Sequence, residues 1–102
     1  MWIFLPGSCL SVVQKPGDTD MLTVRARIHG DIEAVFPDAV VEADKGTDYK
    51  YRARVSRQAV AQVLHDQVMN LNWDNFKGAV KDRKRHDAYM NVWRAMYAVQ
   101  DR

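Results

Sequence analysis

The chain has 102 residues, enough to bury one hydrophobic core without disulfides or metal ions, so we expect a single domain over 1–102. A hydrophobic fraction of 47% and a charged fraction of 27% are ordinary for a globular protein and exclude disordered and fibrous classes. The formal net charge of +2 is too small to indicate nucleic-acid binding by itself.

The first half of the chain has the sequence pattern of β-strands. Residues 2–5 are bulky and apolar, residues 9–13 are rich in β-branched side chains, and a Pro-Gly turn separates them, which favours two strands or one broken strand. Apolar and polar residues alternate over 22–28 and again over 49–55, the period of a half-buried strand. Residues 39–43 are predicted to form a further strand.

Helical segments follow each of the two alternating stretches. Gly30 and Asp31 are predicted to end the first stretch and cap a short helix that Pro37 stops. Ser56 is a good N-cap for a longer helix that ends near 70–72. From Trp73 onward the sequence is helical with a break at 81–85, and Asp82 can cap the final helix.

Two stretches resemble copies of one plan, since Val24-Arg25-Ala26-Arg27-Ile28 and Tyr51-Arg52-Ala53-Arg54-Val55 each follow a turn and precede a helix. We therefore predict an α+β fold in which two β-hairpin-helix units form one antiparallel sheet of four to five strands. The helices are expected on one face of the sheet, followed by a C-terminal helical tail.

Basic residues of the two copies alternate with apolar ones and are expected to share one face of the sheet, where guanidinium groups suit phosphates or carboxylates. The predicted partner-binding residues of this face are Arg25, Arg27, Lys50, Arg52 and Arg54. The alternative is a solvated face on which Glu42 and Asp44 neutralise the arginines. Tyr49 and Tyr51 are expected on the opposite face, which argues against base stacking beside the arginines.

The C-terminal segment carries two further candidate surfaces. A basic run before the last helix is a second candidate for partner binding, or simply an exposed connection, and consists of Lys81, Arg83, Lys84 and Arg85. The last helix has an aromatic and methionine face that belongs to the core or forms a homodimer, through Tyr89, Trp93, Met96 and Tyr97.

Catalytic chemistry has little support in the sequence. His29, His65 and His86 lack metal-ligand spacing, and the adjacent pairs His65-Asp66 and His86-Asp87 are expected to point apart on a helix. We expect no catalytic residue, metal or cofactor, although a small nuclease using His86 stays open. The single cysteine, Cys9, and the lack of a basic leader or a long apolar run favour a cytoplasmic protein outside the membrane.

The chain also resembles short proteins encoded in bacterial and prophage genomes. The residues that carry this resemblance are Met1-Trp2-Ile3-Phe4, Val24-Arg25-Ala26-Arg27, Gly30-Asp31-Ile32-Glu33, Phe36-Pro37, Asn75-Phe76-Lys77, Arg85-His86, Ala88-Tyr89 and Val92-Trp93. The resemblance implies no activity and assigns no functional residue. It implies a mobile-element setting, in which small proteins often act by binding, as anti-CRISPR inhibitors do.

The expected function is therefore a non-enzymatic protein-binding module that meets an acidic protein surface, as an anti-CRISPR-like inhibitor of a nucleic-acid-handling complex. The alternative is direct nucleic-acid binding. Salt distinguishes the two, because binding to the phosphate backbone weakens steeply as salt rises.

Overall fold

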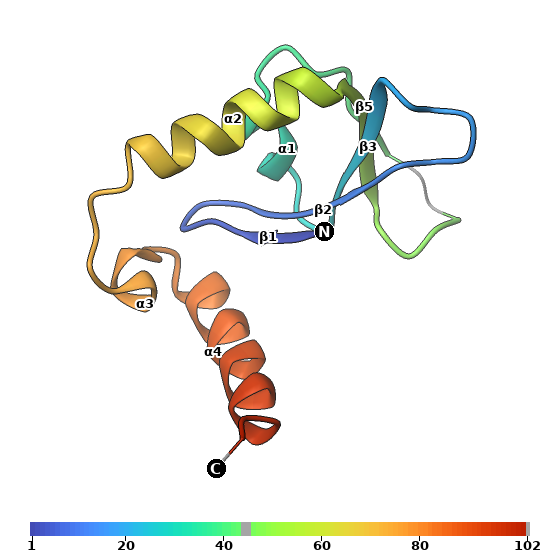
Figure 1. Cartoon of the computed structure of the whole chain (residues 1–102). Coiled ribbons are helices and arrows are strands. Elements are labelled where there is room, and N and C mark those ends of the chain that lie inside the picture. The colour runs from blue at the N-terminus through green and yellow to red at the C-terminus, as the bar shows by residue number, and fades with distance from the viewer. Residues whose placement is uncertain (44–45, 102) are drawn as a thin grey trace. The chain divides into compact units, whose positions relative to one another are not determined.

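The computed structural model describes residues 1–43 and 46–101 and divides into two compact units, residues 1–71 and residues 72–102 (Figure 1). The first unit contains β1 (Trp2–Phe4), β2 (Cys9–Val13), β3 (Met21–Ala26), α1 (Asp31–Val35), β4 (Glu42–Ala43), β5 (Tyr51–Ser56) and α2 (Arg57–Met69). The second contains α3 (Phe76–Ala79) and α4 (Arg83–Ala98). The single domain expected from the sequence stays a prediction.

The five strands of the described residues form one antiparallel sheet in the order β1-β2-β3-β5-β4. The hairpin β2–β3 leads into α1 and the hairpin β4–β5 leads into α2, so the predicted hairpin-helix plan does occur twice. The two hairpins meet where β3 pairs with β5, in a register that places Val24 opposite Ala53. The predicted α+β class, with a helical C-terminal segment, is confirmed.

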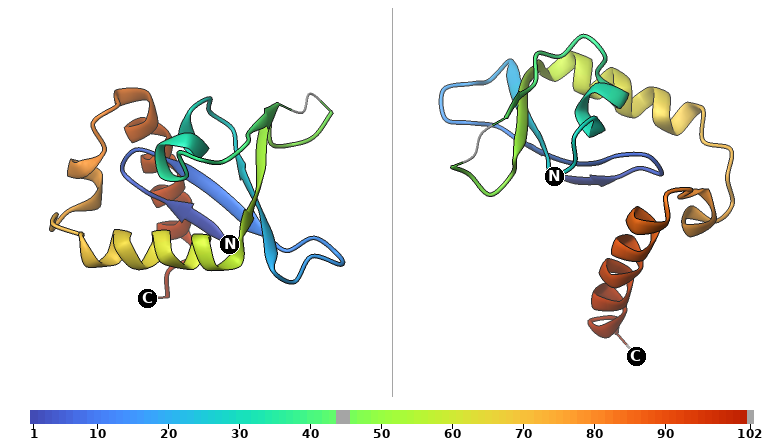
Figure 2. Two further views of the ribbon diagram at one scale, coloured as in Figure 1. Left: turned by 90° about the horizontal axis from the view of Figure 1, so that it is seen from above. Right: turned by 180° about the vertical axis from the view of Figure 1, so that it is seen from behind.

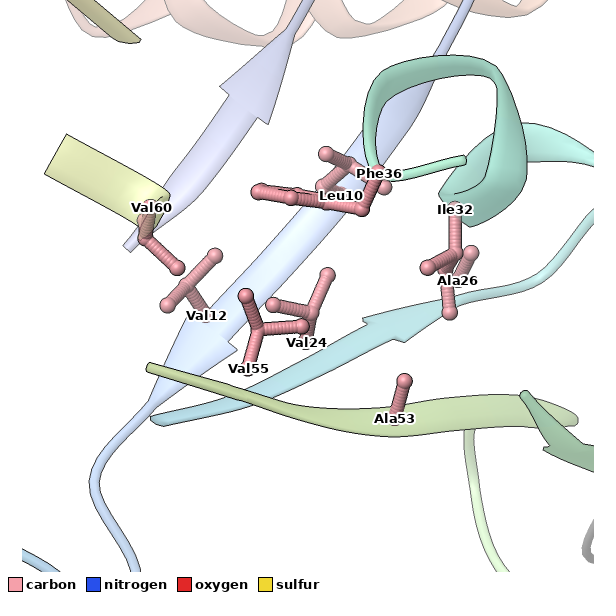
Figure 3. Close-up of a cluster of buried hydrophobic side chains, with 9 residues drawn as sticks. All are labelled: Leu10, Val12, Val24, Ala26, Ile32, Phe36, Ala53, Val55 and Val60. Atoms are coloured by element: carbon pink, nitrogen blue, oxygen red, sulfur yellow. The ribbon is translucent and has the colours of Figure 1, made fainter. Parts of the chain in front are cut away.

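The core lies on one face of this sheet, as strand alternation dictates. Nine buried side chains from the strands, α1 and α2 form it (Figure 3): Leu10, Val12, Val24, Ala26, Ile32, Phe36, Ala53, Val55 and Val60. In every view of Figures 1 and 2, α1 and α2 lie to one side of β3 and β5, while the connection between β2 and β3 projects to the other. Both helices therefore cover the apolar face, and we call the opposite face, which carries neither helix, the open face.

Two side chains predicted to lie on apolar faces, Ile28 and Val68, are exposed instead. Strand β3 ends at Ala26, and the turn closed by the hydrogen bond from the Asp31 N–H to the Ile28 carbonyl leaves Ile28 49% exposed. Val68 is 69% exposed because it lies in the last turn of α2, beyond the turns of this helix that pack on the sheet. The predicted strand 39–43 shortens to β4, since the Ala39 N–H bonds to the Phe36 carbonyl in a turn, and Val40 is exposed.

Helix α2 begins at the predicted cap, where the Ser56 hydroxyl accepts a hydrogen bond from the Ala59 N–H at 3.1 Å. Replacing Ser56 with alanine leaves that N–H without its partner, and we expect the free energy of unfolding to fall by about 1 kcal/mol. Urea denaturation measures this loss. Ser56→Asp, which restores a capping oxygen, should retain most of the stability, and an equal loss in both variants would contradict the assigned cap.

Candidate functional site

The strand register places three arginines on the open face of the sheet. Arg25 of β3 lies directly opposite Arg52 of β5, and Thr23 lies opposite Arg54. Because their neighbours Val24 and Ala53 point into the core, these side chains project from the other face. We call Arg25, Arg52 and Arg54 the arginine face, and the directly opposed Arg25 and Arg52 the central arginines.

Two of the predicted arginines are paired with carboxylates. The guanidinium of Arg54 contacts the Asp18 carboxylate with two nitrogens, at 2.8 and 3.2 Å. Arg27, just beyond the end of β3, contacts Asp48 at 3.3 Å, and the hydrogen bond to that carboxylate raises the pKa of Arg27. Both pairs are exposed to solvent and contribute little to stability.

These acids are not the ones expected from the sequence. Glu42 lies opposite Arg52 in the strand register, but the two form no ion pair in the described part of the chain. Asp44 lies outside the described residues. Two of the predicted arginines are therefore neutralised, as the alternative expected, but by other acids. Asp48 pairs with Arg27, and Asp18 pairs with Arg54.

The central arginines have no carboxylate partner among the described residues. Arg25 donates to the Ser11 hydroxyl at 2.7 Å, and Arg52 donates to the Thr47 hydroxyl at 2.8 Å. The Nε atom of each guanidinium is buried and has no hydrogen-bond partner. Two like charges that face each other across strands, with unsatisfied donors, form an arrangement that lowers stability.

This unfavourable arrangement predicts that removing one central charge stabilises the fold. Arg52→Met keeps the apolar stem while removing the opposed charge and the unsatisfied Nε, so we expect the free energy of unfolding to rise by about 1 kcal/mol. Chemical denaturation is the measurement. Arg54→Met is the matched control and should lose up to about 1 kcal/mol with its ion pair. A larger loss in Arg52→Met than in Arg54→Met would contradict the assigned strain.

Tyr49 lies beside the arginines rather than on the opposite face, so this prediction is wrong. Its ring centroid is 4.5 Å from the Cζ atom of Arg25 and 4.2 Å from that of Arg27. The reason is that β5 begins only at Tyr51, so strand alternation does not extend back to Tyr49. Tyr51 does pack against the core as expected. Because two guanidinium groups already contact the Tyr49 ring, that ring is not an open platform for stacking a base.

Lys50 also precedes β5 and differs from the arginines in what it contacts. Its ammonium lies 5.6 Å from the ring centroid of Tyr51, the residue that packs against the core. The charge of Lys50 is therefore directed toward Tyr51 and is not part of the arginine face.

A groove with a volume of about 390 Å³ is lined by one of the two central arginines, Arg52. From the strands, the lining includes Thr23 of β3 and Arg52, Ala53 and Arg54 of β5. Lys15 and Asp18, from the connection between β2 and β3, also line the groove.

The lining is completed by Val40, which is 80% exposed, and by Glu42 of β4. This segment was predicted to be a full strand, and its irregular course from Pro37 to Val41 leaves Val40 free beside the groove. All of these residues belong to the first unit. The sequence held no local signal for the groove, because its lining comes from segments that lie far apart in the sequence.

The second basic candidate lies in the other unit and is not a simple connection. Arg83, Lys84 and Arg85 form the first turn of α4, whose N-cap is Asp82 as predicted. Cations at this end oppose the helix dipole, an unfavourable placement of about 0.3–1 kcal/mol each. The Lys81 ammonium donates to the Gly78 carbonyl at 3.0 Å. Partner binding by these four residues stays a prediction.

The predicted dimer face of α4 divides into two parts. Tyr89 stacks on Phe76 of α3, with ring centroids 5.6 Å apart. Trp93 and Tyr97 stack on each other at 5.2 Å and are exposed, as is Met96. A homodimer through the exposed part stays a prediction.

The histidine–aspartate neighbours were expected to point apart, and this is wrong. The Nδ1 atoms of His65 and His86 lie 3.3 Å from the carboxylates of Asp66 and Asp87. A hydrogen bond from His65, with a second from Gln62, lowers the pKa of Asp66. The described residues contain no group of three or more histidine, cysteine or acidic side chains placed to hold a metal ion.

Comparisons with protein families, curated proteins and solved structures find no match to this chain. The resemblance to short bacterial and prophage-encoded proteins therefore stays a prediction. In the described ranges, no helix is both long and apolar enough to cross a membrane.

Proposed function

We propose that the protein is a non-enzymatic binding module whose arginine face engages an acidic surface of a partner protein. The observation that carries this proposal is the pair of central arginines, which face each other with no carboxylate partner among the described residues. A carboxylate from a partner would supply the counter-charge that the described residues do not provide and would offset the repulsion between the two like charges.

An acidic protein suits this face better than nucleic acid does. Affinity for the phosphate backbone grows with the number of phosphates neutralised, and strong binders typically contact about 6–10. Here two of the four strand arginines are already paired with Asp18 and Asp48, and Tyr49 is covered by guanidinium groups. Two guanidinium groups that have no carboxylate partner among the described residues support a small charged contact within a protein interface.

The positive charge of the arginine face limits where it could bind on a nucleic-acid-handling complex, the partner expected from the sequence. Proteins that handle nucleic acid bind it in positively charged channels, which a basic face would not enter. If the partner is such a complex, we propose that this protein binds an acidic surface away from that channel.

Two charge-matched polyanions test the proposal directly. Fluorescence anisotropy should show that the full chain binds labelled polyglutamate more tightly than duplex DNA of equal total charge, at the same salt concentration. Tighter binding to DNA, with an affinity that falls steeply as salt rises, would contradict an acidic protein partner and favour the nucleic-acid alternative.

A further inference from the structure

A row of paired residues crosses the open face and connects the central arginines with the edge strand β1. In the strand register, Trp2 of β1 lies opposite Ser11 of β2, and Ser11 lies opposite Arg25 of β3. Arg25 is in turn opposite Arg52. Because Ile3, the neighbour of Trp2, packs against the core, Trp2 projects from the open face, as Arg25 does.

Trp2 is exposed to a degree that is unusual for tryptophan. It is 73% exposed, more than Trp93 at 56%, whereas tryptophan is highly buried on average. Neighbouring strands lie about 4.8 Å apart, so Trp2 and Arg25, which are separated only by β2, are about 10 Å apart in the sheet. One partner surface can therefore contact both side chains.

The guanidinium of Arg25 is held in place within this row. It donates a hydrogen bond to the Ser11 hydroxyl at 2.7 Å, and Ser11 belongs to the strand between Arg25 and Trp2. The Tyr49 ring contacts the same guanidinium, with its centroid 4.5 Å from the Cζ atom. A side chain that is already fixed loses little conformational entropy on binding, so Arg25 is prepared for a carboxylate on the side that faces β1.

The residue types of this row match those that contribute most to protein interfaces. Tryptophan, tyrosine and arginine are enriched among such residues, and a central aromatic side chain typically fills a pocket of the partner. The Tyr49 ring is covered by two guanidinium groups, so it is the ring of Trp2 that is open to a partner. A single open ring suits one apolar pocket better than a run of stacked bases, which needs successive rings.

We propose that Trp2 is the aromatic anchor of the binding face, with its indole in an apolar pocket of the partner and Arg25 on a carboxylate about 10 Å from that pocket. This inference rests on the proposed function, and it adds that the acidic surface of the partner contains an apolar pocket.

A copolymer of glutamate and phenylalanine is the probe, and polyglutamate with the same number of glutamates is the reference. Fluorescence anisotropy should show that the full chain binds the copolymer at least about tenfold more tightly at equal salt, a gain near 1.4 kcal/mol. Trp2→Ala should lose this gain and keep its affinity for polyglutamate. Trp2→Tyr should keep most of the gain, because it retains an aromatic ring with a polar group.

Trp93→Ala is the matched control, since it removes the other strongly exposed tryptophan, in the second unit, and should keep the full gain. Circular dichroism should show that both alanine variants are folded, because each changes an exposed side chain. A wild type without the gain, a gain that persists in Trp2→Ala, or an equal loss in both alanine variants would overturn the inference.

The same titrations separate this inference from the proposed function. If Arg25→Glu prevents binding to polyglutamate while Trp2→Ala keeps the gain, the inference fails and the proposed function stands. If the wild type binds neither polymer, both fail. Tighter binding to single-stranded oligothymidylate than to the copolymer, lost in Trp2→Ala, would assign Trp2 to base stacking and overturn both.

Discussion

Replacing both central arginines with glutamate is expected to abolish binding to polyglutamate and to the natural partner. Arg25 and Arg52 carry the guanidinium groups that have no carboxylate partner among the described residues. A hydrogen bond to a charged group contributes about 1.5–3 kcal/mol, so losing two such contacts should weaken binding at least about a hundredfold. Anisotropy with polyglutamate, together with capture of the partner from a lysate of the source organism, measures the loss.

The matched control for this double variant is Lys77→Glu/Arg94→Glu, which makes the same change in net charge at two exposed positions of the second unit. It should bind within about twofold of the wild type, since neither residue belongs to the arginine face and single exposed charges contribute weakly. Circular dichroism and the melting temperature should show that both variants are folded. Undiminished capture by Arg25→Glu/Arg52→Glu would reject the arginine face as the binding surface.

The largest effect on stability is expected from Ile32→Ala. Ile32 of α1 is completely buried and lies in the core with Phe36 and Ala26 (Figure 3). Removing its side-chain atoms leaves a cavity between α1 and the sheet, which should lower the free energy of unfolding by about 2–5 kcal/mol. Urea denaturation followed by circular dichroism measures this loss, which is a large share of the stability of a small protein.

Val68→Ala is the control for this core variant, because Val68 is a β-branched residue of α2 that is 69% exposed. Its effect should stay within about 0.5 kcal/mol. A loss below about 1 kcal/mol for Ile32→Ala would contradict the packing of α1 on the sheet.

Much of the fold could be predicted from local sequence patterns. Alternation within Leu22–Ala26 and Ala53–Val55 sets which side chains reach the core, because successive residues of a strand point to opposite faces. The caps Ser56 and Asp82 begin α2 and α4 as expected, since each accepts a hydrogen bond from a backbone N–H three residues later.

The side-chain directions that were predicted wrongly lie at the ends of strands. Alternation was extended to Ile28 and to Tyr49, but both lie outside the observed strands β3 and β5. Outside a strand, the local backbone sets the side-chain direction, so Tyr49 turns toward Arg25 and Arg27. Turn residues such as Gly30, which has a positive φ of 91°, mark these ends in the sequence only approximately.

Whether each arginine pairs with a carboxylate could not be predicted, because the tertiary structure decides which side chains meet. Asp18 is 36 residues from Arg54 and lies in the connection before β3, yet the fold brings the two side chains together. Glu42 sits opposite Arg52 in the strand register and still makes no ion pair with it in the described chain. Only the structure separates the central arginines from the two that are neutralised.

The NMR signals of the arginine Nε–H groups test most directly whether the central arginines, and not the two neutralised ones, bind carboxylates. In a titration of polyglutamate into the ¹⁵N-labelled full chain, the signals of Arg25 and Arg52 should shift to saturation, while those of Arg27 and Arg54 stay nearly constant. Shifts confined to Arg27 and Arg54, or no shift in any of the four, would show that the central arginines do not bind carboxylates.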